Sequence, residues 1–302
     1  MLRVRRQVEV PLDLFAEKQL GTTVAVLDTG IGRHPDLTGR LLCFRDFTEN
    51  RNLMYDDNGH GTHVCGIICG SGVLSHGKYQ GMAPRSRLVV GKVLDKKGDG
   101  TTENMLAGLQ WVLSLRDKYR VRVLNISVGI GSLDDREKEG ALQRQIEELW
   151  DSGIVVVCAA GNKGPGNDSI SSVGASRRVI TVGCHDGGYF WGNPKRCEMY
   201  SGRGRFSDTM RKPDIVAPGT DIISCDRDCR LVNGHYQKVY IAKSGTSMAT
   251  PIVTGAIARL LDQFPNMTNE EVKQKLTMTA TDLGEPWNKQ GWGMVNVRRL
   301  LE

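Results

Sequence analysis

Three residue types that together can cleave acyl bonds occur in a defined order in this chain: an aspartate, a histidine and a serine. Ser247 lies between Gly245 and an apolar run, residues 252–261, that is typical of a buried helix. Pro251 is expected in the first turn of this helix, where its missing N–H costs nothing. Ser247 then lies at a helix N-terminus and either caps the helix or acts as a nucleophile whose developing charge the helix end stabilises.

The positions of the histidines restrict the kind of chemistry. Every histidine precedes Ser247, and the six are His34, His60, His63, His76, His185 and His235. The G-x-S-x-G hydrolases need their histidine after the serine, and the last glycine of that pattern is absent at Ala249. The order aspartate, histidine, serine remains open.

Two stretches supply the acid and the base for that order. Residues 22–28 form an apolar, β-branched run that ends in Asp28, as at the C-terminal end of a buried parallel strand. His60 is flanked by glycines and opens another apolar helix. Each has a plainer explanation, because Asp28 could cap a turn, and His60 with His63 could form a polar cluster or a metal pair. The H-E-x-x-H pattern of zinc proteases is absent.

Four blocks in this order resemble the signature blocks of the subtilisin family of serine proteases. They are residues 26–30 (Val-Leu-Asp-Thr-Gly), 60–64 (His-Gly-Thr-His-Val), 159–162 (Ala-Ala-Gly-Asn) and 245–251 (Gly-Thr-Ser-Met-Ala-Thr-Pro). The resemblance implies that Ser247 attacks the substrate carbonyl and that His60 takes its proton while Asp28 orients the imidazole. It also implies that the Asn162 amide and the Ser247 backbone N–H stabilise the oxyanion, and that His63 is structural.

The same resemblance indicates where a peptide substrate would lie. Two glycine-containing segments follow predicted strands and would hold an extended peptide as an added antiparallel strand. Their residues are Gly98, Asp99, Gly100, Ser127, Val128 and Gly129. Lys163, directly after the oxyanion asparagine, is expected at the rim of the pocket for the side chain preceding the scissile bond. Lys163 would then either point to solvent or face the pocket, where large apolar substrate residues would remain acceptable, acidic ones would be tolerated more than usual, and lysine or arginine would be disfavoured.

The remaining pattern predicts an α/β fold in three layers, with a mostly parallel central sheet and helices on both faces. Strands and helices alternate from residue 87 onwards. The predicted strands are 88–94, 121–126, 154–159 and 179–183, and the predicted helices are 103–119 and 136–150. Because sites in such sheets form at the carboxyl ends of strands, we expect Asp28 and Asn162 to meet there. The whole chain, 1–302, is expected to be one catalytic domain.

Composition excludes several function classes. The net charge of +6 is mild and the arginines are scattered, so no nucleic-acid stripe is expected. The longest apolar run, residues 154–160, is too short to span a membrane. Residues 1–20, read as an N-terminal extension without a recognisable prodomain, show no secretory signal. The chain is therefore expected to be cytoplasmic, or else a secreted enzyme trimmed to its mature form.

Cysteines and loops complete the expectations. Eight cysteines indicate a reducing compartment, and only Cys225 and Cys229 have a spacing that invites a disulfide or a metal. No cofactor is required. Residues 70–81 lack the asparagine-rich turn that holds calcium in secreted relatives and resemble the cytoplasmic bacterial branch of the family, so calcium dependence is open. Residues 185–204 and 225–240 are long polar excursions, the second a hairpin around Asn233-Gly234.

The sequence therefore predicts a serine endopeptidase that acts on protein or peptide substrates. Two alternatives stay open: a maturation protease dedicated to one precursor, and a catalytically silent binding protein on the same fold. The oligomeric state is not predicted.

Overall fold

A seven-stranded sheet forms the centre of the molecule. The computed structural model describes residues 1–11, 21–128, 136–190, 192–205 and 210–302, so Gly129 lies outside the described residues. All neighbouring strands in this sheet run parallel, in the order β2-β3-β1-β4-β5-β6-β7. The strands are β1 (Thr23–Asp28), β2 (Leu41–Asp46), β3 (Arg87–Lys92), β4 (Val121–Ile126), β5 (Val155–Ala159), β6 (Ile180–Cys184) and β7 (Ile215–Ala217).

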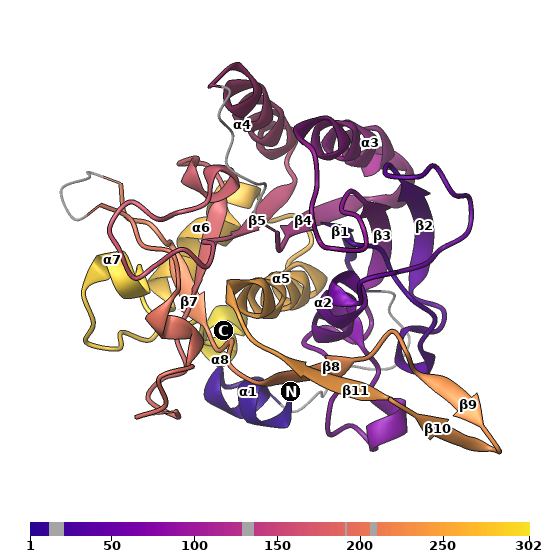
Figure 1. The fold of residues 1–302 in the computed structure, drawn as a ribbon. Coiled ribbons are helices and arrows are strands. Elements are labelled where there is room, and N and C mark those ends of the chain that lie inside the picture. The colour runs from indigo at the N-terminus through magenta and orange to yellow at the C-terminus, as the bar shows by residue number, and fades with distance from the viewer. Residues whose placement is uncertain (12–20, 129–135, 191, 206–209) are drawn as a thin grey trace.

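Helices cover both faces of this sheet. In Figure 1, α3 and α4 pack against each other on one face, while α2 and α5 pack together on the other. The predicted three-layer fold is therefore confirmed. The helices are α1 (Leu2–Gln7), α2 (His60–Cys69), α3 (Thr102–Tyr119), α4 (Arg136–Asp151), α5 (Thr246–Gln263), α6 (Asn269–Met278), α7 (Trp287–Gln290) and α8 (Val297–Leu301).

Burial explains why these segments were recognisable. β1, β5 and β6 are buried at every position because helices cover both faces, and their runs of valine and isoleucine suit that environment. The predicted strand 121–126 has the bounds of β4. The predicted strand 88–94 ends two residues early, at Lys92. The edge strands β2 and β7 were not predicted, since β2 is half-exposed and β7 is only three residues long.

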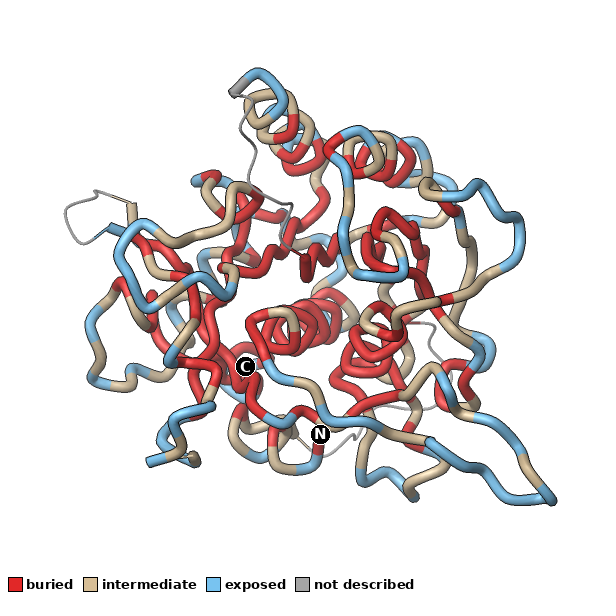
Figure 2. The backbone as a smooth tube through the Cα atoms, viewed as in Figure 1, coloured by how far each residue is buried: buried red, intermediate tan, exposed pale blue. Residues whose placement is uncertain are grey.

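The second polar excursion forms two antiparallel pairs outside the main sheet. β8 (Ile222–Cys225) pairs with β11 (Tyr240–Lys243), and β9 (Arg230–Val232) pairs with β10 (His235–Gln237). The two-residue connection Asn233-Gly234 has φ of 50° and 79°, the left-handed values that a tight hairpin turn needs. The predicted hairpin is confirmed, and Figure 2 shows it as one of the most exposed parts of the chain.

The N-terminal segment packs against the rest of the fold. Val4 and Val8 are buried, and the Val8 carbonyl accepts a hydrogen bond from the Val297 N–H at 2.8 Å. α1 thereby lies beside α8, so both ends of the described chain join the same core (Figure 1).

Candidate active site

Asp28 and His60 form the central pair of the site. Asp28 ends β1, is fully buried, and accepts hydrogen bonds through Oδ1 from His60 Nδ1 and from the Thr29 N–H, each at 2.7 Å. A carboxylate can only accept, so Nδ1 carries the proton and Nε2 of His60 is left with its lone pair. The imidazole is therefore held in the tautomer that a general base needs.

The charge of Asp28 also sets the basicity of His60. Burial lowers the pKa of His60, but the attraction and hydrogen bond of Asp28 raise it by more, so the net pKa lies above its ordinary value of 6.5. His63 behaves in the opposite way. Burial, and then the neighbouring His60, lower the pKa of His63 to about 3, and its Nε2 contacts the carbonyl oxygens of Ile222 and Ile241. His63 is thus a neutral core histidine.

A buried carboxylate holds the start of α2 against β1. Asp56 accepts hydrogen bonds from the hydroxyls of Thr29 and Thr62 at 2.9 and 2.6 Å and from the Gly59 N–H at 2.7 Å. Burial raises the pKa of Asp56, but these hydrogen bonds, that of Thr62 first, lower it by more. The Thr29 hydroxyl in turn accepts from the Gly61 N–H. Asp56 therefore fixes His60 relative to Asp28, a role that sequence analysis missed although the residue lies four positions before the histidine.

A buried lysine ties three segments of the site together. Lys92, paired in register with Asp28 on the neighbouring strand, has a fully buried side chain. Its Nζ donates to the carbonyl oxygens of Thr29 and Leu94 at 3.0 and 2.7 Å and to Asp57 Oδ1 at 2.7 Å. Sequence analysis missed this residue too, although a cation within an apolar strand was the available signal.

The serine lies at the start of α5, after a strained glycine. Gly245 has φ of 145°, which side chains rarely adopt, and a Cβ there would lie 3.3 Å from Asn162 Nδ2. α5 begins at Thr246, so Ser247 is its second residue and Pro251 its sixth. The prediction that Pro251 lies in the first turn is wrong. The glycine, not the proline, marks the helix start, because only Gly245 permits the sharp turn into the helix.

Asn162 is held beside this turn. Its amide Oδ1 accepts hydrogen bonds from the N–H and the hydroxyl of Thr246, both at 3.1 Å. Because the oxygen is occupied, Nδ2 is the atom of this exposed side chain that can donate to a bound group. The next residue, Lys163, is also exposed.

His60 and Ser247 line one cavity. Its volume is about 240 Å³, and it brings together residues from both glycine-containing segments. The lining residues are Thr29, Asn58, His60, Leu94, Lys97, Gly98, Ser127, Val128 and Ser247. Within the described chain, five predicted residues do not line it: Asp28 is fully buried, Asp99 and Gly100 lie in the adjoining turn, and Asn162 and Lys163 lie outside its wall.

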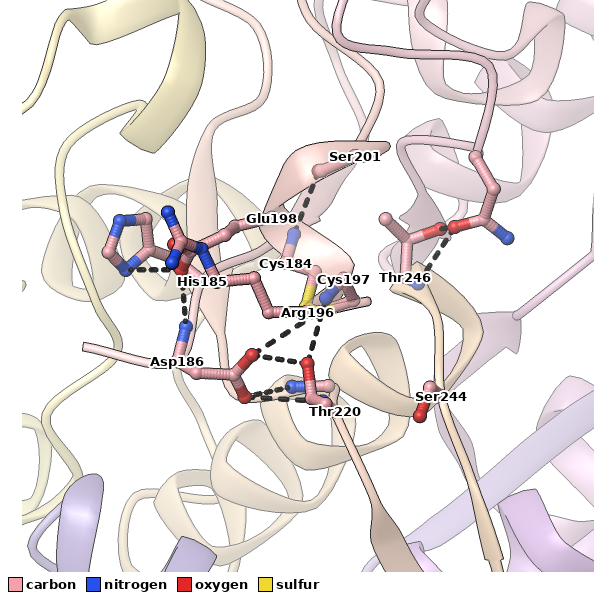
Figure 3. The surroundings of a disulfide bond; sticks show 12 residues. Cys184, His185, Asp186, Arg196, Cys197, Glu198, Ser201, Thr220, Ser244 and Thr246 are labelled. Carbon is pink, nitrogen blue, oxygen red and sulfur yellow. Dashed lines mark hydrogen bonds and ion pairs between the residues drawn. A yellow bond between two sulfur atoms is a disulfide. The ribbon is translucent and has the colours of Figure 1, made fainter. Parts of the chain in front are cut away.

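A disulfide that sequence analysis did not single out lies behind the turn at Gly245, just before Ser247. Cys184 and Cys197 are bonded, and a Cβ at Gly219 would meet both sulfur atoms. Figure 3 shows the buried Asp186 beside this bond, accepting from Thr220. Gly219 connects the disulfide to the turn before Ser247, since its carbonyl accepts a hydrogen bond from the Gly245 N–H at 2.9 Å. The pair closes the first polar excursion against β6.

The pair singled out from sequence, Cys225 and Cys229, consists of free thiols. Cys225 lies close to His34 and Asp36, a set of possible metal ligands. However, both nitrogens of His34 have protein partners, the Asp36 N–H and the Val239 carbonyl, and burial raises the pKa of the Cys225 thiol well above its usual range. The arrangement is that of a hydrogen-bonded core cluster.

Comparison with known proteins agrees with this geometry. The sequence model of the subtilase family matches residues 19–293. "Serine protease AprX" of Bacillus subtilis (strain 168) is 41% identical over 297 residues, which cover 93% of this chain and 66% of that relative. "Subtilisin Savinase" of Lederbergia lenta is 34% identical over 280 residues, covering 91% and 89%. "Intracellular serine protease" of Paenibacillus polymyxa is 32% identical over 296 residues, covering 93% and 81%.

The length of the match differs among these relatives. This chain spans about two thirds of AprX but most of the Savinase protein. None of the described helices is long and apolar enough to cross a bilayer. The family match extends from the lead-in of β1 to the turn after α7 and includes Asp28, His60, Asn162 and Ser247. This chain belongs to the subtilase family.

Proposed function

We propose that the protein is a serine endopeptidase. The observation that carries the proposal is the placement of His60, whose Nδ1 is bonded to buried Asp28 at 2.7 Å and whose ring lines the same cavity as Ser247. A base oriented by a carboxylate and adjacent to a serine at a helix start is the arrangement that activates a hydroxyl nucleophile. The names of the relatives, serine proteases and subtilisins, support the same activity.

The reaction assigns one role to each residue. Ser247 Oγ attacks the scissile carbonyl carbon as His60 Nε2 takes the hydroxyl proton, and the imidazolium then gives that proton to the leaving amine. Asp28 stabilises the imidazolium without accepting the proton. Asn162 Nδ2 and the Ser247 N–H donate to the oxyanion, which forms beside the N-terminus of α5. A water molecule, deprotonated by His60, then attacks the acyl-enzyme ester in the same way and releases the acyl product and free Ser247.

The substrate backbone lies between the two glycine-containing segments. Gly98, Ser127 and Val128 line the cavity on one side of His60, so an extended peptide there can add main-chain hydrogen bonds. We assign Asp99, Gly100 and Gly129 to the same two glycine-containing segments on the strength of the family resemblance. We assign Lys163 to the rim of the pocket for the side chain preceding the scissile bond. We also assign residues 1–302 to one catalytic domain.

Covalent labelling with a fluorophosphonate, together with hydrolysis of a peptide substrate, tests the assignment. Ser247→Ala and His60→Ala should each lower the rate by roughly 10⁶-fold, the loss that removing either residue causes in subtilisin. Ser247→Ala should also lose labelling. Folded wild-type protein that neither labels nor cleaves would favour the silent binding protein. Cleavage confined to one sequence in a peptide library would favour the dedicated maturation protease.

We further propose that no cofactor is needed and that the enzyme works in a reducing compartment on protein or peptide substrates, without nucleic-acid or membrane partners. Six cysteines are free, and one of the relatives is named an intracellular protease. EDTA should leave both activity and the melting temperature unchanged, and a large fall in melting temperature would reveal a calcium site. Thiol counting on denatured, unreduced protein should find six free thiols.

A further inference from the structure

A groove with no assigned role lies beside the active site, under the β9–β10 hairpin. Its volume is about 600 Å³. The floor is apolar and includes Ile31, Leu37 and Leu41, while the hairpin contributes Leu231 and Tyr236. The two hairpin side chains are 60% and 45% exposed, so large apolar surface is left facing solvent in the free protein.

The charge of this groove is one-sided. Arg33 and Arg230 line it, and its wall contains no aspartate or glutamate. Within the described part of the chain, neither guanidinium forms an ion pair. An apolar floor with two unneutralised cations is complementary to a chain that carries large apolar and acidic side chains.

The position of the groove identifies which chain that is. The loop that leads to His60 has two sides. On one side Asn58 Nδ2 donates to the Lys96 carbonyl at 3.1 Å, next to the glycine-containing segment around Gly98. On the other, a Cβ at Gly59 would lie 3.1 Å from the side chain of Arg227, at the base of the hairpin. The groove therefore lies on the opposite side of His60 from the two glycine-containing segments.

The same Arg227 connects the site to the groove. A Cβ at Gly32 would lie 3.4 Å from its Cβ, and Gly32, four residues after Asp28, lines the groove. A polypeptide that leaves the scissile bond away from Gly98 and Ser127 thus passes over the partly exposed Arg227 side chain, which covers the buried Gly59, and enters the groove at Gly32.

We propose that this groove binds the part of a polypeptide substrate on the C-terminal side of the scissile bond, and that it favours a large apolar residue followed by an acidic one. The inference rests on the proposed peptidase function and deepens it. Because these contacts are made equally in the ground state and the transition state, they lower KM and leave kcat unchanged.

Two kinds of substrate with the same acyl-side sequence test the proposal. A p-nitroanilide has no residue after the bond, and quenched peptides carry roughly six, which extend over about 20 Å. In the wild type, peptides with Leu and Glu should exceed those with two Ser residues by about tenfold in kcat/KM. They should exceed those with Leu and Lys by about fivefold.

Hairpin variants give the sharper result. Leu231→Ser with Tyr236→Ser should abolish the preference for leucine, and Arg230→Glu should reduce or reverse the preference for Glu over Lys. Lys238→Glu makes the same charge change on the same hairpin but outside the groove wall, so it should leave the Glu-to-Lys ratio unchanged. All variants should cleave the p-nitroanilide at the wild-type rate, because none contacts the acyl side.

The outcomes separate this inference from the proposed function. If the wild type does not cleave the p-nitroanilide, the peptidase function fails. If it cleaves the p-nitroanilide but the peptide ratios do not change in the hairpin variants, only the groove assignment is overturned. A concentration-dependent dimer in sedimentation that Leu231→Ser dissociates would likewise overturn it, in favour of contact between copies of the chain.

Discussion

In the described part of the chain, two lysines are buried at opposite parts of the sheet, with side chains 0% and 3% exposed: Lys92 at the end of β3 and Lys212 before β7. Each donates three hydrogen bonds and pairs with one aspartate, Asp57 or Asp214. A buried cation is costly unless it is paired and hydrogen-bonded, and both meet that condition. By their own burial and by the number of hydrogen bonds that they donate, the two lysines are closely alike.

The segments that they join distinguish them. Lys92 connects Thr29, next to Asp28, with Asp57, which precedes His60 by three residues, and with Leu94, which lines the cavity. Each of its acceptors therefore belongs to the active site.

Lys212 instead connects segments at the far edge of the sheet. Its acceptors are the Val179 carbonyl, the Thr181 hydroxyl and Asp214, and Asp214 also pairs with Lys273 at 3.0 Å. Burial lowers the pKa of Lys212 to about 8, against the opposing effect of Asp214. The comparison teaches that a buried ion pair acquires a role in catalysis from the segments that it holds, and not from its own strength.

The largest effect should come from the acidic members of the two regions. Asp28→Asn should lower kcat by about 10⁴-fold with little loss of stability, because an amide at that place favours the wrong tautomer of His60. Asp214→Asn should leave kcat near the wild-type value but lower the free energy of unfolding by about 3–5 kcal/mol, since it breaks a buried pair. Steady-state kinetics and urea unfolding on both variants measure this. A folded Asp28→Asn protein with wild-type kcat would contradict the assignment.

The lysines themselves give the direct test of the comparison. Lys92→Met and Lys212→Met should destabilise the protein by similar amounts, about 3–5 kcal/mol, because each removes the three hydrogen bonds that a buried ammonium donates. Only Lys92→Met should also lower kcat/KM, by about 10²-fold, since a small displacement of Thr29 and Asp57 moves Asp28 relative to His60. Activity is measured at a temperature where far-UV circular dichroism shows both variants folded. Equal activity in the two would mean that the Lys92 bonds only stabilise the fold.

A third test uses pH and the two histidines of α2. His63 is neutral in the fold, with its pKa lowered to about 3 by burial, and would titrate near 6.5 when unfolded. Its contribution to stability is therefore complete above pH 6.5 and is lost as the pH falls from there towards 3, on the order of 4 kcal/mol in all. His60 has the opposite shift, so kcat/KM should already fall at a pH above 6.5 while the protein is still fully stable.

Urea unfolding and kcat/KM across pH 4 to 8 separate these two effects. Coincident curves would contradict the opposite assignment of the two histidines.

The parts of the site that could be predicted from sequence are those with a local signal. Asp28 follows an apolar strand, His60 opens a helix between glycines, and Asn233-Gly234 is a hairpin turn in its own right. The layered fold could be predicted because alternating apolar strands and helices leave few ways to bury both.

What could not be predicted depends on contacts between distant segments. The carboxylate of Asp56 and the amine of Lys92 are ordinary polar residues until folding places their acceptors around them. The pairing of Cys184 with Cys197 requires the excursion between them to return to β6, and the spacing of 13 residues does not indicate it. Pro251 was misplaced because a proline inside a helix is rarer than one in the first turn, and the tertiary turn at Gly245 overrides that tendency.

The smallest effect should come from a third lysine, Lys163, which lies at the catalytic end like Lys92 but is exposed like a surface residue. The two properties lead to different expectations: proximity to Asn162 predicts an influence on the substrate side chain before the scissile bond, whereas exposure predicts that water screens most of it. Lys163→Glu should therefore leave stability unchanged and shift the ratio of kcat/KM between Glu and Lys substrates by only about threefold towards Lys, with Leu substrates unaffected. Lys118→Glu, an equally exposed change near the C-terminal end of α3, serves as the control for net charge and should not shift the ratio. A shift of the Glu-to-Lys ratio of the same size in both variants would mean that the overall electrostatic field of the protein acts on the substrate. In that case an exposed lysine at this end of the sheet would have no effect of its own position, and only a buried lysine such as Lys92 would affect catalysis through its exact place.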